Sequence, residues 1–135
     1  MRRMTGRRAR GLAVVAGTIR MASGISFLIA PEAANRLWGD EEDSGPTASL
    51  LLRSMGYRDA LVGALLLWSG LRGSRTMAGW FLASAGADAA DLAGGIANVD
   101  RMSEQQKRRG LGGAALGIGV GVLGAASAIG SRPRR

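Results

Sequence analysis

The chain has 135 residues, enough for one domain, and its 18 Lys and Arg against 10 Asp and Glu give a formal net charge of +8. It contains no Cys and no His, which excludes thiol chemistry, disulfides and the commonest transition-metal ligands. Aromatic residues make up only 4 %, whereas 22 residues are glycine. Small residues at this density suit close approach of helices in lipid rather than a soluble core of bulky side chains. Because Cys and His are absent, we predict no catalytic residue, cofactor or metal site.

The basic residues are concentrated at the edges of apolar stretches, as in membrane proteins. No aromatic residues interleave with them, as a stacking surface for single-stranded nucleic acid would require. We expect the lipid bilayer, and not nucleic acid, as the partner. The clusters comprise Arg2, Arg3, Arg7, Arg8 and Arg10, then Lys107, Arg108 and Arg109, and finally Arg132, Arg134 and Arg135.

Four apolar stretches each have the roughly 20 residues that a helix needs to cross the hydrocarbon of a bilayer. The first is stopped by Pro31, and only the fourth is free of charge. The sequence predicts an all-α fold, with a single four-helix transmembrane bundle over residues 11–130 between basic tails at 1–10 and 131–135. The stretches cover residues 11–30, 47–70, 76–97 and 110–130.

The connections between the stretches predict an orientation. Residues 32–46 hold five acidic residues against Arg36 alone, whereas residues 71–75 hold two arginines and no acid. Because Lys and Arg are favoured on the cytoplasmic side, we expect both termini inside and a multi-pass protein of the inner membrane. Residues 98–110 do not fit, since they would lie outside with four basic and two acidic residues. Either they rest on the membrane surface, or the third stretch does not fully cross.

Six charged residues fall within the predicted spans, three of each sign. Charge in lipid is tolerated mainly when it is paired or faces a wet cavity, so equal numbers favour internal pairing. The six residues are Arg20, Arg53, Arg58, Asp59, Asp88 and Asp91.

The rise of about 1.5 Å per residue places these charges at matching depths as Arg20–Asp59, Arg58–Asp88 and Arg53–Asp91. At about 100° per residue, the three charges of the second stretch point in different directions. We therefore expect the second stretch to be central, with its carboxylate facing the first stretch and its two arginines facing the third. The adjacent Arg58 and Asp59 would then serve different neighbours.

Three functions remain open at this point. The first is a structural or accessory membrane component, in which Arg–Asp pairs fix the order and register of the helices. The second is the handling of a proton, a cation or a small polar solute through a cluster of Arg58, Asp59, Asp88 and Asp91. The third, a subunit of a membrane oxidoreductase, has the least support, because the usual haem and iron–sulfur ligands are missing.

Glycines recur at helical spacing and predict close contacts between helices. They are seven residues apart on the first and second stretches and four apart on the fourth. Packing within the bundle is the simpler interpretation, and a seam on the fourth stretch for a homo-oligomer or another membrane protein is the alternative. The residues are Gly17, Gly24, Gly56, Gly63, Gly113, Gly117 and Gly121.

The segments "GTIRMASGISFLIAPEAANRLWG", "LLRSMGYRDALVGALLL" and "ADAADLAGG" together make a pattern over about residues 11–98. This pattern resembles an uncharacterised family of small four-helix bacterial membrane proteins. The family has a Gly-x-Arg-Asp-x-x-x-Gly motif in the second helix, which here reads "GYRDALVG", and acidic residues in the third. The resemblance implies a fold and no activity. A looser similarity to the quinone- or redox-associated DoxX proteins is fold-level analogy alone.

Overall fold

The computed structural model describes residues 2–37 and 45–130, with side chains from Gly6 onward in the first helix. All regular structure within these ranges is helical. The long helices are α1 (Arg2–Ile29), α3 (Pro46–Arg72), α4 (Met77–Ala97) and α6 (Gly112–Gly130). The short elements are α2 (Pro31–Leu37), η1 (Val99–Arg101), α5 (Glu104–Gln106) and η2 (Lys107–Leu111), the last a π-helical turn.

The long helices follow the four apolar stretches, with one difference at the N-terminus. Residues 2–10, expected as a basic tail, continue the first helix, because arginine is a good helix former. The helix stops before Pro31, as the sequence predicts, and this proline opens α2 at the first helical position, where its missing N–H costs nothing.

The turn between α3 and α4 is closed by a glycine and by an arginine from α1. Gly73 has the left-handed φ of 62° that favours glycine after a helix, and its N–H donates to the Gly70 carbonyl at 3.2 Å. Arg10 donates from Nε to the same carbonyl at 3.1 Å and from Nη2 to the Leu71 carbonyl at 2.9 Å. The last carbonyls of α3 therefore gain partners that the helix itself does not supply.

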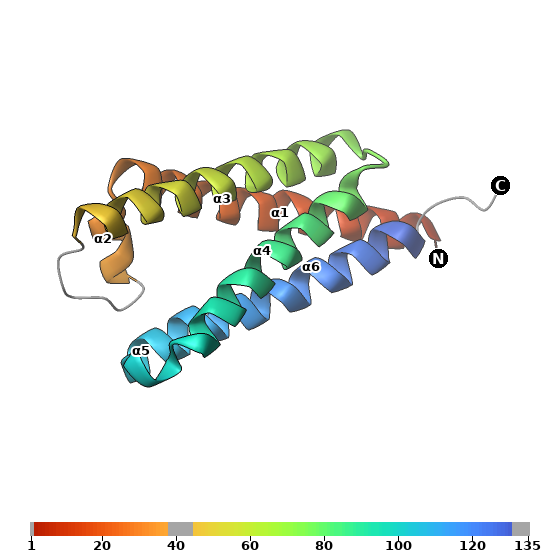
Figure 1. Cartoon of the computed structure of the whole chain (residues 1–135). Coiled ribbons are helices and arrows are strands. Elements are labelled where there is room, and N and C mark those ends of the chain that lie inside the picture. The colour runs from red at the N-terminus through yellow and green to blue at the C-terminus, as the bar shows by residue number, and fades with distance from the viewer. Residues whose placement is uncertain (1, 38–44, 131–135) are drawn as a thin grey trace.

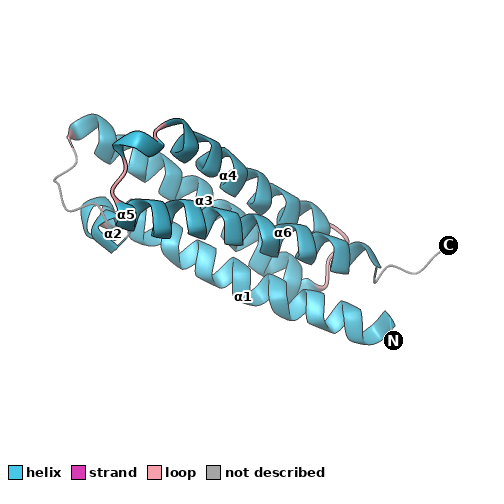
Figure 2. Cartoon of the chain, turned by 90° about the horizontal axis from the view of Figure 1, so that it is seen from below, coloured by secondary structure: helices cyan, strands magenta, loops and turns pink. Residues whose placement is uncertain are grey.

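The long helices are arranged as two antiparallel pairs, α1 with α3 and α4 with α6, which run along roughly one direction (Figure 2). The start of α1, the α3–α4 turn and the end of α6 lie at one end of the molecule (Figure 1). At the other end, where α2 and α5 lie, the α4–α6 pair swings away from the α1–α3 pair (Figure 1).

Glycines bring α1 and α3 into backbone contact. A Cβ atom on Gly17 would lie 2.8 Å from the Gly63 carbonyl oxygen, and a Cβ on Gly63 would lie 2.8 Å from the Gly17 carbonyl oxygen. One heptad further on, a Cβ on Gly24 would lie 2.5 Å from the Gly56 carbonyl oxygen. Only glycine fits at these four positions without moving the helices apart.

The glycines of α6 face α4 of the same chain. A Cβ on Gly121 would lie 2.8 Å from the Phe81 carbonyl oxygen, and a Cβ on Gly117 would lie 2.6 Å from Cγ of Asp88. Gly113, the third residue of this ridge, is half-buried. The ridge therefore packs against α4 of the same chain at Gly117 and Gly121.

The buried apolar core lies toward the end that holds the N-terminus and the α3–α4 turn. Phe81 is completely buried there, with its ring against Gly124. Because the core is at this end, the helix pairs stay together here and can separate at the other. The core comprises Ala9, Ala13, Leu66, Met77, Ala78, Phe81, Ala125 and Ala128.

Large apolar side chains are exposed on all four long helices, most of them on α1, α3 and α6. In a water-soluble domain most such side chains would be buried, and a surface as apolar as this normally marks a contact with lipid or protein. The exposed residues include Val15, Ile19, Ile29, Leu50, Leu61, Leu71, Leu82, Ile96, Leu116, Val122, Leu123 and Ile129.

Candidate functional site

Arg20 lies in the second half of α1 and joins three helices. Its Nη1 donates to Oγ of Ser84 at 2.8 Å and to Oδ2 of Asp88 at 2.9 Å, both on α4. Its Nη2 donates to Oδ1 of Asp59 on α3 at 3.1 Å. The three charged side chains are 12 %, 13 % and 17 % exposed, so these ion pairs are largely removed from solvent. Its Nε is also buried and has no hydrogen-bond partner among the described residues.

Arg58 continues the same set of contacts on α3. Its Nε donates to Oδ1 of Asp59 at 3.0 Å, and its Nη1 and Nη2 form a bidentate pair with Oδ1 and Oδ2 of Asp91 at 3.0 and 2.7 Å. Bidentate Arg–carboxylate contacts combine charge with fixed geometry and are among the stronger hydrogen-bonded pairs. The Arg58 and Asp91 side chains are 35 % and 37 % exposed, so this pair is more open than that of Arg20.

Together the five side chains form one chain of alternating charge, which we call the ion network. The order of contacts is Asp88, Arg20, Asp59, Arg58, Asp91. Two positive and three negative groups leave a formal net charge of −1 (+2 − 3). Alternation places every charge next to an opposite one, which lowers the cost of holding charge away from water.

The depths of the charges predicted one of the three expected pairs. Arg20 contacts Asp59, as expected. The expected Arg58–Asp88 pair was wrong, because Asp88 binds Arg20 instead. The expected Arg53–Asp91 pair was also wrong, since both oxygens of Asp91 are bound by Arg58. An arginine side chain reaches several ångströms along a helix, so similar depths do not determine which aspartate it pairs with. The crossing of α4 over α3 determines the pairing.

The directions of the three charges on α3 were partly predicted. Asp59 faces α1 and Arg58 faces α4, as expected. Arg53 instead donates to the Leu28 carbonyl near the end of α1, where backbone carbonyls lack partners within the helix. Arg58 and Asp59, expected to serve different neighbours, also contact each other.

Two further residues complete the surroundings of the ion network. Ser84, which the sequence prediction missed, lies four residues before Asp88 on the same face of α4, and this spacing is the signal that could have found it. Gly117 on α6 leaves room for the Asp88 carboxylate, which a side chain there would displace.

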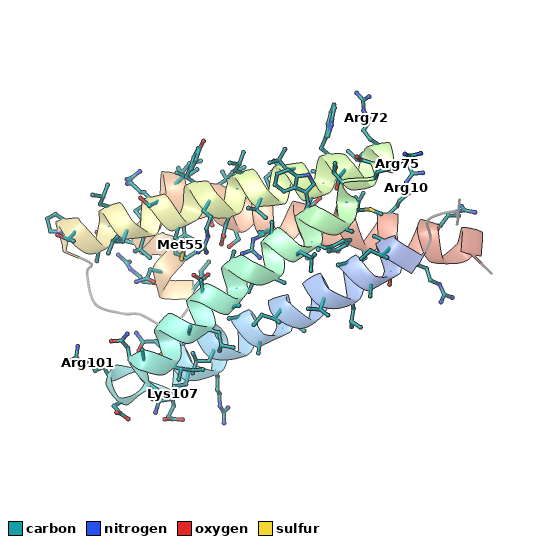
Figure 3. The ribbon with its side chains drawn as sticks, turned by 45° about the vertical axis from the view of Figure 1, so that its right-hand side comes forward. Arg10, Met55, Arg72, Arg75, Arg101 and Lys107 are labelled. Carbon is teal, nitrogen blue, oxygen red and sulfur yellow. The ribbon has the colours of Figure 1, made fainter. Side chains whose placement is uncertain are left out.

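A cavity of about 590 Å³ borders the open end of the ion network, where α3 and α4 diverge (Figure 1). Its wall contains Arg58 and Asp91 together with apolar side chains of α3, including Met55, which points toward the interior of the molecule (Figure 3). The sequence analysis left open a site for a small polar solute at Arg58 and Asp91, but it did not foresee the apolar wall on α3 or the contribution of Asn35 on α2. The lining residues are Asn35, Ala48, Leu51, Leu52, Ser54, Met55, Arg58 and Asp91.

A family model for a domain of unknown function, DUF4267, matches residues 17–129, which is most of the chain. The chain belongs to the DUF4267 family. The matched region contains the whole ion network and also α6, which lay beyond the segments of the sequence resemblance. Comparison with curated proteins and with solved structures finds no match.

Two helical segments of this DUF4267 protein are long and apolar enough to cross a membrane, judged by length and composition among the described residues. They are Gly6–Ile29 and Glu104–Gly130. In each, only 22 % of the most apolar 18-residue window is buried, whereas a core helix of a soluble protein is mostly buried. The α3 and α4 helices, which supply most of the ion network, are not among them.

Basic side chains of the DUF4267 protein lie at both ends of the long helices. Arg10, Arg72 and Arg75 lie at the end of the α3–α4 turn, and Arg101 and Lys107 lie at the opposite end (Figure 3). The Arg72 guanidinium lies 4.4 Å from the centre of the exposed Trp68 ring, a cation–π geometry.

Proposed function

We propose that this chain is a multi-pass protein of the bacterial inner membrane, in which all four long helices cross the bilayer as one bundle. Its role is that of a structural or accessory membrane component, and the ion network holds α1, α3 and α4 in register. The observation that carries this proposal is the distribution of polarity. Buried charge occupies the interior, while large apolar side chains cover the outside.

The ion network also explains how α3 and α4, which are poor membrane spans alone, can cross the bilayer. A charged residue at the centre of a helix costs about 2.5–3.5 kcal/mol on insertion. The charges of α3 and α4 find opposite charges on their neighbours, which lowers this cost once the helices assemble. The segments Gly6–Ile29 and Glu104–Gly130, which are apolar enough to span alone, would enter first and provide the surface against which α3 and α4 pack.

The basic connection after α4 departs from the positive-inside tendency in the proposed orientation, but some of its basic residues have local partners. Lys107 pairs with Glu104 at 2.8 Å, and Arg109 donates to the Leu37 carbonyl at the end of α2 at 2.6 Å. These contacts support a connection held against the protein at the outer surface. They fit the proposed orientation, in which both termini and the Arg72–Arg75 turn face the cytoplasm.

Cysteine labelling tests this topology, because the natural chain has no cysteine. Ser74→Cys places a thiol in the α3–α4 turn, and Gln105→Cys places one in the connection after α4. In intact spheroplasts, a membrane-impermeant maleimide should label Gln105→Cys at once and Ser74→Cys only after permeabilisation. Labelling of both from the same side would show that α4 does not cross. Release of the chain from membranes by alkaline carbonate would contradict the membrane assignment itself.

The cavity supports a second candidate function, the handling of a small polar or cationic solute. The specific observation is that the half-exposed Arg58–Asp91 pair forms part of its wall. A purely structural ion pair has no need of such an opening.

A further inference from the structure

We propose that the cavity between α2, α3 and α4 binds a protonated primary alkylamine. The ammonium group contacts the Asp91 carboxylate, and the alkyl chain lies on the apolar side chains of α3. This inference rests on the proposed membrane function, because its charge argument requires a low-dielectric surrounding. It names the class of solute that the second candidate function leaves open.

The charge of the ion network favours a cation. Two arginines and three aspartates leave one negative charge without a balancing positive one. One monovalent cation brings the sum to zero, whereas an anion would bring it to −2. Water in the open cavity can solvate Asp91, but the surrounding lipid cannot solvate the network as a whole, so the network gains from a cation and loses from an anion. Arg53, the nearest further arginine on α3, is directed to the Leu28 carbonyl and not to this network.

Asp91 is the carboxylate that a ligand can reach. It is 37 % exposed and belongs to the cavity wall, whereas Asp59 and Asp88 are largely buried among the helices. Each Asp91 oxygen accepts one hydrogen bond from Arg58, and a carboxylate oxygen has capacity for more than one. A primary ammonium group brings three donors, so it can bind Asp91 without displacing Arg58.

The rest of the wall selects an organic amine over an inorganic ion. Ala48, Leu51, Leu52 and Met55 offer a surface that gains free energy by covering an alkyl chain and gives nothing to a hydrated metal ion. The volume of about 590 Å³ lies in the usual range for small-molecule sites. The lining residues include no aromatic ring of the kind that surrounds quaternary ammonium groups, which favours an amine with N–H donors.

The test is calorimetric titration at pH 7 of the full chain in nanodiscs of phosphatidylcholine, a lipid without a primary amine. Hexylamine should bind, and hexanoate and hexyltrimethylammonium should bind at least tenfold more weakly. Asp91→Asn removes the charged acceptor and should weaken hexylamine binding by about tenfold or more. Asp100→Asn makes the same change at an exposed acid outside the ion network and should leave binding unchanged.

A second variant protects the test against a folding defect in Asp91→Asn. Met55→Trp fills the cavity and leaves every charge in place, so it should abolish hexylamine binding while the helical circular dichroism is retained. Equal binding by the natural chain, Asp91→Asn and Met55→Trp would overturn the proposal, as would tighter binding of hexanoate than of hexylamine.

A lipid headgroup can present the same chemistry as a free amine. Repeating the titration with phosphatidylethanolamine in the nanodiscs separates the two sources, since a headgroup that occupies the site would suppress hexylamine binding. If Ser74→Cys and Gln105→Cys label from opposite sides but hexylamine does not bind in phosphatidylcholine, only the proposed amine site is contradicted. Recovery of the chain as a soluble monomer without detergent would contradict the proposed membrane function.

Discussion

The two ends of the ion network differ in how far their side chains are buried. This difference separates a structural role at one end from a binding role at the other. At one end Arg20 joins α1, α3 and α4 through Ser84, Asp88 and Asp59, with little exposure of any charged group. At the other end Arg58 and Asp91 make a better hydrogen-bonded pair, yet more than a third of each side chain is exposed next to a cavity.

This comparison shows that the geometry of an ion pair does not by itself reveal its contribution to stability. Breaking a buried pair leaves charge without a partner or water, which costs about 3–5 kcal/mol. Exposed pairs typically contribute about 0–1 kcal/mol, because water replaces the lost partner. We therefore expect the Arg20 end to hold the helices together, and the Arg58–Asp91 end to remain available for a ligand.

The largest expected effect is at the buried end. Arg20→Gln leaves the Asp59 and Asp88 carboxylates without their shared cation and should lower the free energy of unfolding by about 3–5 kcal/mol. Unfolding in mixed micelles, followed by circular dichroism, measures the change. Arg8→Gln removes an exposed arginine from the same helix and serves as the matched control. A similar small effect of both variants would contradict the structural role of Arg20.

A smaller effect is expected where α1 meets α3. Gly24→Ala would press a methyl group against the backbone of Ala60 and the Gly56 carbonyl, and should cost about 1–3 kcal/mol by forcing the helices apart. This change also draws Arg20 away from Asp59 while leaving the Arg58–Asp91 pair in place. The same unfolding assay measures it.

Gly11→Ala is the control for this glycine contact. A Cβ at Gly11 would meet nothing within 4 Å, so alanine should be neutral or stabilising by about 0.5–1 kcal/mol through its higher helix propensity. If Gly24→Ala were tolerated as well as Gly11→Ala, the close approach of α1 and α3 would not be needed for stability.

The smallest effect is expected at the open end. Arg58→Gln leaves Asp91 at the cavity, where water can solvate it, and should lower the free energy of unfolding by about 1 kcal/mol or less. Measured beside Arg20→Gln in the same micelles, this variant decides whether the two ends differ. A loss as large as that of Arg20→Gln would erase the distinction between them.

The sequence predicted the long helices well, because their limits depend on local features. Apolar stretches of spanning length and the stop at Pro31 locate α1, α3, α4 and α6 to within a few residues, apart from the early start of α1. The seven-residue spacing of glycines on α1 and α3 indicated close helix packing without naming the partner helix, and in the structure the equal spacings of this antiparallel pair come into register.

The details of the site depend on features that no local pattern contains. Whether Asp88 binds Arg20 or Arg58 is decided by the rotation of α4 and its crossing over α3, and depth alone gave the wrong partner. Ser84 lies in an apolar run, and its role depends on a hydrogen bond from Arg20, which is distant in the sequence. The cavity arises from the divergence of two helix pairs and from α2, a short helix within a connection rich in acidic residues.

A double-mutant cycle on Arg20 and Asp88 tests the central claim most directly. The free energies of unfolding of the natural chain, Arg20→Gln, Asp88→Asn and the double variant are measured in the same micelles. Side chains in one buried ion network should show coupling of about 1–3 kcal/mol, so the double variant should lose less stability than the sum of the single losses. Additive losses would contradict a buried ion network that joins α1 to α4.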